Sequence, residues 1–199
     1  AYRARYPKVN LSIESGWSLE TIGRIMTYDL DLGLLVLFSP KLRAFQQLPL
    51  VPLATTDLVF VTAPNDRLAG KKKTTWDDLK EAPWILNHDV CVYRSYSHIE
   101  SRLKERGQAL KVEVEVMGLE LQKKLTELGL GVSLLPRNFV TTELRQGSLK
   151  ALNVEGTKLQ VYSCLVLRKD KYIHGAMKGF LRLVQETFQP PKNGLTRYL

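Results

Sequence analysis

One stretch, residues 112–137, most constrains the fold of this chain because its hydrophobic period changes twice. Three valines alternate with glutamates and predict a strand with one buried face: Val112, Val114 and Val116. Three leucines then recur at helical spacing and predict a helix with its leucines packed inward: Leu121, Leu125 and Leu128. Gly129 and Gly131 are suited to ending this helix, and residues 132–135 read as a buried strand. A strand–helix–strand unit predicts a parallel sheet, and therefore an α/β fold.

The rest of the chain repeats this theme of strands and helices. Further strands are predicted at residues 9–14, 31–38, 57–63, 84–87 and 159–168. The continuous apolar run at 31–38 is expected to be buried on both faces. Further helices are predicted at residues 18–28, 75–82, 98–106, 139–147 and 176–188, with Ser18, Thr75 and Ser97 at helix starts. This order suggests two α/β lobes, with the chain crossing near Thr62 and near Leu165 and a hinged cleft between the lobes.

Composition and charge exclude some classes of function and favour an anionic partner. The net charge of +9 favours an anionic partner, but the basic residues are scattered, and the one run, Lys71–Lys73, sits in a predicted loop. No basic helix with interleaved aromatic residues is present, so the chain itself is not expected to bind nucleic acid. No apolar run is long enough to span a bilayer. Two cysteines, Cys91 and Cys164, do not make a disulfide framework and favour a reducing compartment.

Catalytic and metal chemistry find little support. The sequence has no nucleophile elbow, metalloprotease helix or phosphate-binding loop, so no catalytic residues and no cofactor are predicted. His88, Asp89, Cys91 and His98 lie close in sequence, but their spacing matches no common zinc pattern and no metal is expected. Cys91 has no nearby resolving cysteine, which argues against a redox sensor.

Candidate ligand contacts lie where strands end and helices begin, because free backbone N–H groups and the helix dipole there favour anions. One lobe contributes Gly16, Trp17, Ser18 and Ser39. The other lobe contributes the starts of two predicted helices, with these residues: Arg94, Ser95, Ser97, Met117, Gly118 and Leu119. Arg94 could pair with a carboxylate in bidentate fashion, although a solvent-facing arginine is the simpler alternative.

Three segments carry a resemblance to a known family. YPKVNLSIESGWSLETIGRIMTYDLDLGLL, DLVFVTAPNDRLAG and ELGLGVSLLPR occur in the order and spacing of the effector-binding domain of LysR-type transcriptional regulators. The resemblance covers almost the whole chain. It implies a fold similar to type 2 periplasmic binding proteins, with two Rossmann-like lobes: residues 1–62 with 166–199, and residues 63–165.

The resemblance also implies a function and partners. A small metabolite, with anions as one candidate class, would bind in the cleft between the lobes and act through a winged helix-turn-helix that precedes this domain. The family implies a cytoplasmic homodimer or homotetramer, with antiparallel subunits that place lobe one against lobe two. The helix at 18–28 and the strand at 9–14 are the candidate contacts. The main alternative is a solute-binding protein of an ABC transporter, and a second is an enzyme on the same scaffold.

Two departures from the family pattern matter. No helix-turn-helix is present in the sequence, so DNA would be bound only through another segment. The family's domain opens with a strand and most of a helix before the YP motif, whereas this sequence begins near the end of that helix. The first strand of lobe one is therefore expected to be missing from this sequence, and it is truncated, disordered or supplied by another segment.

Overall fold

The computed structural model describes residues 2–38, 48, 50–88, 90–104, 107 and 109–188, without the side chains of residues 90–95 and 98. The chain forms two compact units. Unit 1 comprises residues 1–55 and 162–199, and unit 2 comprises residues 56–161. Both boundaries fall inside strands, since β2 (Leu50–Thr62) and β7 (Gln160–Val166) each continue from one unit into the other.

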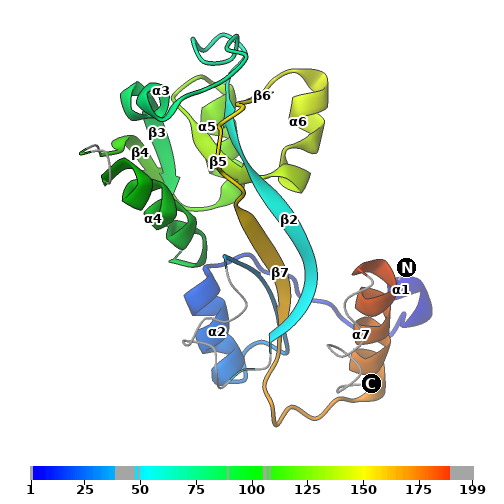
Figure 1. Ribbon diagram of the computed structural model, residues 1–199. Coiled ribbons are helices and arrows are strands. Elements are labelled where there is room, and N and C mark those ends of the chain that lie inside the picture. The colour runs from blue at the N-terminus through cyan, green and yellow to red at the C-terminus, as the bar shows by residue number, and fades with distance from the viewer. Residues whose placement is uncertain are drawn as a thin grey trace. The chain divides into compact units, whose positions relative to one another are not determined.

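Unit 1 is built on an antiparallel pair, β1 (Gly33–Leu37) with β7, and β2 lies on the other side of β7. Its core packs α7 (Gly175–Phe188) against the strands through these residues: Val51, Leu53, Leu165, Leu167, Met177, Leu181 and Val184. The short helix α1 (Tyr2–Arg5) lies beside α7 (Figure 1), where the Tyr2 hydroxyl donates to the Ala176 carbonyl over 2.8 Å. The helix α2 (Ser18–Met26) covers β1, with Ile25 fully buried.

Two sequence expectations for unit 1 are wrong. Residues 9–17 contain no regular secondary structure, and the side chain of Ile13 is 88% exposed. A strand needs a neighbour to receive its backbone hydrogen bonds, and no described strand pairs with this segment. The strand at 33–37 is buried on one face only, because Leu34 points outward and is 57% exposed.

Unit 2 contains a mixed sheet. The strand β3 (Pro83–Asn87) pairs in parallel with β4 (Lys111–Val116), and a parallel bridge joins Trp84 to Val132 at the start of β5 (Ser133–Pro136). The strand β5 pairs antiparallel with β2, which also pairs with the two-residue strand β6 (Lys150–Ala151). The parallel strand–helix–strand unit of β4, α5 (Leu119–Glu127) and β5 is therefore confirmed.

The helices of unit 2 cover this sheet. They are α3 (Trp76–Glu81), α4 (Val90–Lys104), α5 and α6 (Thr141–Gln146), with a 3-10 turn at Arg137–Phe139 before α6 (Figure 1). The largest fully buried side chain is Trp84, whose indole N–H donates to the Leu79 carbonyl over 2.8 Å. The edges of the Phe60 and Tyr96 rings meet Trp84 at close to right angles, which joins β2, β3 and α4 in one core.

The strand at 111–116 differs from its predicted burial. Only Val116 is buried, whereas Val112 is 39% exposed and Val114 is half-buried. Among the described strands β4 pairs with β3 alone, so it lies at the edge of its sheet. Alternation therefore identified the strand but overstated how much of its apolar face is covered.

The N-terminus of α3 has the capping box that its sequence predicts. The Thr75 hydroxyl accepts from the Asp78 backbone N–H, and the Asp78 carboxylate accepts from the Thr75 backbone N–H over 3.0 Å. Lys71 donates to the same carboxylate over 2.5 Å. The Lys71 ammonium and the Thr75 N–H lower the pKa of Asp78 to about 2.

Replacing Asp78 with asparagine is expected to lower the free energy of unfolding by about 1 kcal/mol at neutral pH. A lowered carboxyl pKa stabilises the folded state above the unfolded value and loses this effect as the pH falls through the folded value. The difference between wild type and D78N should therefore shrink between pH 3.8 and about 2. Urea titrations across this range measure it, with D77N as the control, and a difference that stays constant with pH would contradict the assignment.

Candidate functional site

The start of α5 in unit 2 presents exposed backbone. Met117 is 52% exposed, and Gly118 is the N-cap, with φ of 92° and no atom within 4 Å of the place where a β-carbon would lie. Only glycine adopts this backbone conformation readily, and it leaves the helix end open to a ligand. Leu119 is half-buried and packs on the cluster formed by Val59, Val61, Leu135, Val140 and Leu149. The first N–H groups of a helix lack intrahelical partners, so this end can receive an anion.

The carboxyl ends of two parallel strands meet at this helix start. Asn87 ends β3 and is the register partner of Val116, which ends β4. The backbone N–H of His88 donates to the Val116 carbonyl over 2.9 Å. The His88 side chain is exposed, and its Nε2 lies 2.6 Å from Glu115 Oε2. Ligands of open parallel sheets bind at this kind of edge.

Sequence reasoning missed Asn87 and His88 as contributors to this edge. The signal was present, because both residues follow directly from the predicted strand at 84–87. The backbone of His88 contacts that of Val116, the residue before Met117.

The candidates Arg94, Ser95 and Ser97 lie inside α4 rather than at its N-terminus. The helix begins at Val90, immediately after β3, so the predicted start near residue 97 is wrong. Ser97 and Glu100 have the spacing of a capping box, which predicted a helix start at Ser97. The same spacing also occurs between two residues on one face of a helix interior, as it does here. The side chains of Arg94 and Ser95 fall outside the described residues.

The candidates in unit 1 lie at the start of α2. Trp17 is the N-cap and is 43% exposed, and Ser18 is the first helical residue and is buried, so Ser18 is not the cap. The backbone carbonyl of Trp17 accepts from Thr21, which fixes the first turn. Gly16 is exposed and precedes the cap, and Ser39 falls outside the described residues.

A buried polar network fixes the position of α5. Gln122 is fully buried, and its Nε2 donates to the Ile85 carbonyl over 3.0 Å and to the Tyr96 hydroxyl over 2.6 Å. The Thr126 hydroxyl donates to the Gln122 carbonyl over 2.8 Å and lies 2.7 Å from Ser133 Oγ. These bonds tie α5 to β3, α4 and β5, so the helix start is held against a rigid sheet. Burial raises the pKa of Tyr96 to about 12, so its hydroxyl stays protonated and can donate.

Of the three leucines expected to pack inward, Leu121 and Leu128 face away from the core and Leu125 is only half-buried. Leu121 is 50% exposed and Leu128 is 65% exposed, whereas the buried positions of the helix are Gln122 and Thr126. The helical period was correct, but the polar stripe rather than the leucine stripe packs on the sheet. Leu121 within α5 and Leu128 at its C-cap form the exposed leucine row of this helix.

Metal and thiol chemistry find no further support in the structure. Over the described part of the chain, no group of three or more histidine, cysteine, aspartate or glutamate side chains could hold a metal. The side chains of Cys91 and His98, on which the sequence-based metal hypothesis depended, fall outside the description. Cys164 is buried and reduced, and burial raises the pKa of its thiol to about 11.

Comparison with known proteins gives one family. The LysR substrate binding domain matches residues 1–189. This is a family of transcriptional regulator domains rather than an enzyme family. The transcriptional regulator CzcR of Bacillus anthracis is 26% identical over 186 residues, which cover 94% of this chain and 60% of CzcR. The chain thus spans about 60% of the length of such curated relatives.

Solved structures of related domains share the fold. The effector-binding domain of QuiR, in complex with shikimate, superposes with a TM-score of 0.74 at 20% identity, over 94% of this chain and 87% of that chain. The regulatory domain of CcmR from Synechocystis PCC6803, in complex with 2-PG, superposes with a TM-score of 0.76 at 17% identity, over 96% of this chain and 88% of that chain. The fold is therefore the type 2 periplasmic-binding-protein-like α/β fold. No helix in the described residues is long and apolar enough to cross a membrane.

Proposed function

Since this chain belongs to the LysR substrate-binding domain family and is the effector-binding domain of a LysR-type regulator, we propose that it senses a small anionic metabolite for a DNA-binding protein. The metabolite would bind at the helix starts, and binding would change how the whole protein engages DNA through a segment outside this chain. A ligand shifts such an equilibrium only by its difference in affinity for the two states. The family match favours this function over that of a transporter's solute-binding protein.

The exposed start of α5 carries the proposal. Gly118 leaves the helix end uncovered, Met117 offers an apolar contact, and the exposed His88 follows the adjoining strand end, where the buried Asn87 donates to Gln122. The buried bonds of Gln122 hold this end in place before a ligand arrives, which limits the entropy lost on binding. From unit 1 we propose Gly16, Trp17, Ser18 and Ser39 as further contacts, and from α4 Arg94, Ser95 and Ser97.

An anion is the proposed class of effector for two reasons. The N-terminus of α5 carries a positive partial charge, and the chain carries a net charge of +9. The related domain of QuiR is complexed with shikimate, which is a carboxylate, and that of CcmR is complexed with 2-PG. The effector of this chain is accordingly sought first among carboxylates and phosphate esters.

The site is tested by a thermal-shift screen of metabolites on this chain, followed by two variants of Met117. Met117→Glu places a carboxylate at the helix start, where the dipole favours the folded helix but a bound anion would be repelled. We expect M117E to weaken binding of an anionic hit by roughly tenfold or more, and Met117→Gln to weaken it far less.

Comparison of M117E with M117Q shows whether the ligand binds at the start of α5 and whether its charge matters there. Equal weakening by M117E and M117Q would show that the charge of the ligand is irrelevant at this end. A hit whose affinity changes in neither variant would show that the ligand binds elsewhere in the domain.

We further propose that the leucine row of α5 packs against α2 of a second copy of this chain. Leu121 and Leu128 are exposed on α5, and Leu19 and Met26 are half exposed on α2, which supplies an apolar partner surface. In an antiparallel pair of copies each contact would occur twice, which is the self-complementary arrangement of a twofold dimer. Residues 9–14, predicted as a strand contact, would take part as an extended segment.

Replacing both Leu121 and Leu128 with glutamate is expected to convert the dimer to a monomer while leaving the fold intact. Both side chains already face solvent, so the free energy of unfolding should change by less than about 0.5 kcal/mol per site. Analytical ultracentrifugation measures the change in mass. Tyr172→Glu, which alters an 82% exposed aromatic residue elsewhere, is the matched control. A wild-type chain that is monomeric at high concentration, or a double variant that stays dimeric, contradicts the proposed face.

The absence of catalytic activity and a location in the cytoplasm are parts of the same proposal. The family is one of regulator domains, and a regulator of this kind acts where DNA is present. Turnover of any metabolite that binds the domain would contradict the first of these two parts.

A further inference from the structure

We propose that unit 2 has a second small-molecule site, separate from the start of α5, which binds a carboxylate that carries a planar apolar ring. It consists of a cavity of about 290 Å³ lined by Lys73, Thr74, Thr75, Trp76, Arg102 and Glu155. A smaller cavity of about 90 Å³ adjoins it, since Trp76 and Arg102 line both, and its other walls are Ile99, Gly156, Thr157, Lys158 and Leu159. None of these residues belongs to the helix start proposed as the effector site.

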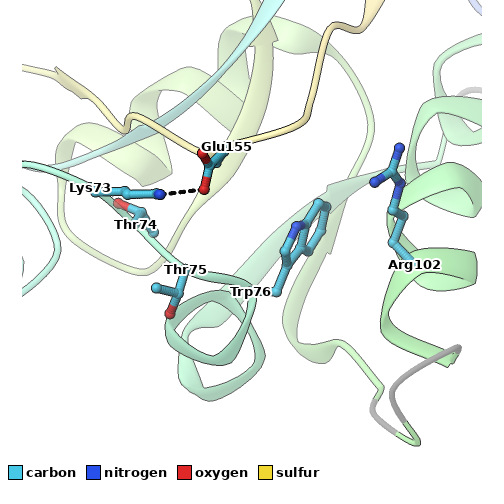
Figure 2. A pocket seen from close by; sticks show the side chains of 6 residues that line it. All are labelled: Lys73, Thr74, Thr75, Trp76, Arg102 and Glu155. Atoms are coloured by element: carbon cyan, nitrogen blue, oxygen red, sulfur yellow. Dashed lines mark ion pairs between the residues drawn. The ribbon is translucent and has the colours of Figure 1, made fainter.

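The walls of this second site come from three parts of unit 2. Trp76 is the first residue of α3, Arg102 lies in the last turn of α4, and Glu155 lies in the turn that follows β6 (Figure 2). In the view of Figure 2 the Trp76 ring lies between the Lys73–Glu155 pair and the Arg102 side chain, and all four residues line the cavity. A planar group seated between Trp76 and Arg102 would contact the indole face and place its charge near the guanidinium.

Hydrogen bonds to backbone carbonyls form these walls before any ligand binds. The Thr74 N–H donates to the Asn153 carbonyl over 2.9 Å, and Asn153 Nδ2 donates to the Lys72 carbonyl over 3.2 Å. The Thr157 hydroxyl donates to the Val154 carbonyl over 2.9 Å and fixes the turn. Binding sites for small molecules are mostly preformed in this way, with apolar walls and a few polar groups.

The charges and surfaces of the lining select the ligand class. Three cationic side chains, Lys73, Arg102 and Lys158, face one carboxylate, Glu155, so the site attracts anions. Ile99 and Leu159 are buried at the base of the smaller cavity and supply apolar contact for a ring. Arginine binds a carboxylate through two parallel hydrogen bonds, and an indole face stacks on a planar ring.

The pair of Lys73 and Glu155 regulates access of an anion to this lining. The two side chains form an ion pair, drawn as a dashed line in Figure 2, and both are more than half exposed. An exposed pair of this kind contributes little stability, so Lys73 can exchange Glu155 for a ligand carboxylate at low cost. The Glu155 carboxylate meanwhile repels the same ligand.

The test uses phenylacetate as the probe, phenylacetamide as its neutral analogue and acetate as the anion without a ring. The chain has three tryptophans, and the indole N–H signal of Trp76 is assigned by its loss in Trp76→Phe. In NMR titrations phenylacetate should shift the Trp76 signal, whereas the buried Trp84 should be unaffected and both comparison compounds should act only weakly.

Two charge variants give opposite expected results. Arg102→Gln should weaken phenylacetate binding roughly tenfold, and Glu155→Gln should tighten it several-fold because the repulsion is removed and Lys73 is released. Arg145→Gln, which removes an exposed arginine of α6, is the matched control and should change nothing.

The proposal is overturned if phenylacetate at millimolar concentration leaves the Trp76 signal in place, or if phenylacetamide binds equally well. It is also overturned if E155Q weakens binding, since a purely structural role of the Lys73–Glu155 pair predicts that sign. A shift of the Trp17 signal without one at Trp76 would assign the probe to the α2 start instead.

Discussion

Gly131→Ala is expected to lower the free energy of unfolding by about 3 kcal/mol. A β-carbon at residue 131 would lie 2.5 Å from the Pro83 carbonyl oxygen and 3.0 Å from its carbon. That carbonyl accepts from the Val132 N–H over 2.8 Å, in the bridge that joins β3 to β5. Because both contacting atoms belong to backbone, the clash is relieved only by separating the two strands.

Urea unfolding followed by tryptophan fluorescence measures this effect. Gly70→Ala is the matched control, because a β-carbon there meets no atom within 4 Å and the residue lies in an exposed loop. The control should change the unfolding free energy by less than about 0.5 kcal/mol. A G131A protein as stable as the control would mean that β3 and β5 do not approach as closely as described.

Gln122→Leu is expected to lower the unfolding free energy by about 2 kcal/mol and also to weaken effector binding. Leucine has a similar volume, so the loss comes from hydrogen bonds and not from a cavity. The Ile85 carbonyl and the Tyr96 hydroxyl lose a donor inside the core. The amide that holds the first turns of α5 against β3 is lost at the same time, so the proposed ligand site loosens.

Two readouts distinguish this positioning role from simple destabilisation. Gln146→Leu makes the same chemical change at an exposed position of α6 and should affect neither stability nor binding. Effector affinity is measured well below the unfolding transition, where both proteins are folded. Reduced stability with unchanged affinity would show that Gln122 supports the core without positioning the helix start.

Periodicity predicted the elements of unit 2 well, because a strand and a helix differ in the spacing of apolar residues. The spacing of apolar residues predicted β4, α5 and β5, and the capping-box spacing at Thr75 predicted the start of α3. It also placed Met117–Leu119 at the end of a parallel strand, where the structure has them.

The errors occurred where tertiary contacts decide between local alternatives. The face of α5 that packs inward is set by the bonds of Gln122 to Ile85 and Tyr96, which lie far along the chain. The spacing of the leucines alone therefore predicted the wrong buried face. The alternation of residues 9–14 fits a strand, but a strand exists only beside another strand. Ser97 and Glu100 had the spacing of a helix start and lie inside α4, which begins at Val90.

The edge position of β4 has a consequence for handling this protein. An unpaired strand edge with half-exposed valines is a template for joining another chain, and natural proteins guard such edges with charge. Here the guards are Lys111, Glu113 and Glu115, all exposed. Variants that replace the two glutamates with neutral residues should therefore make the protein aggregate through this edge.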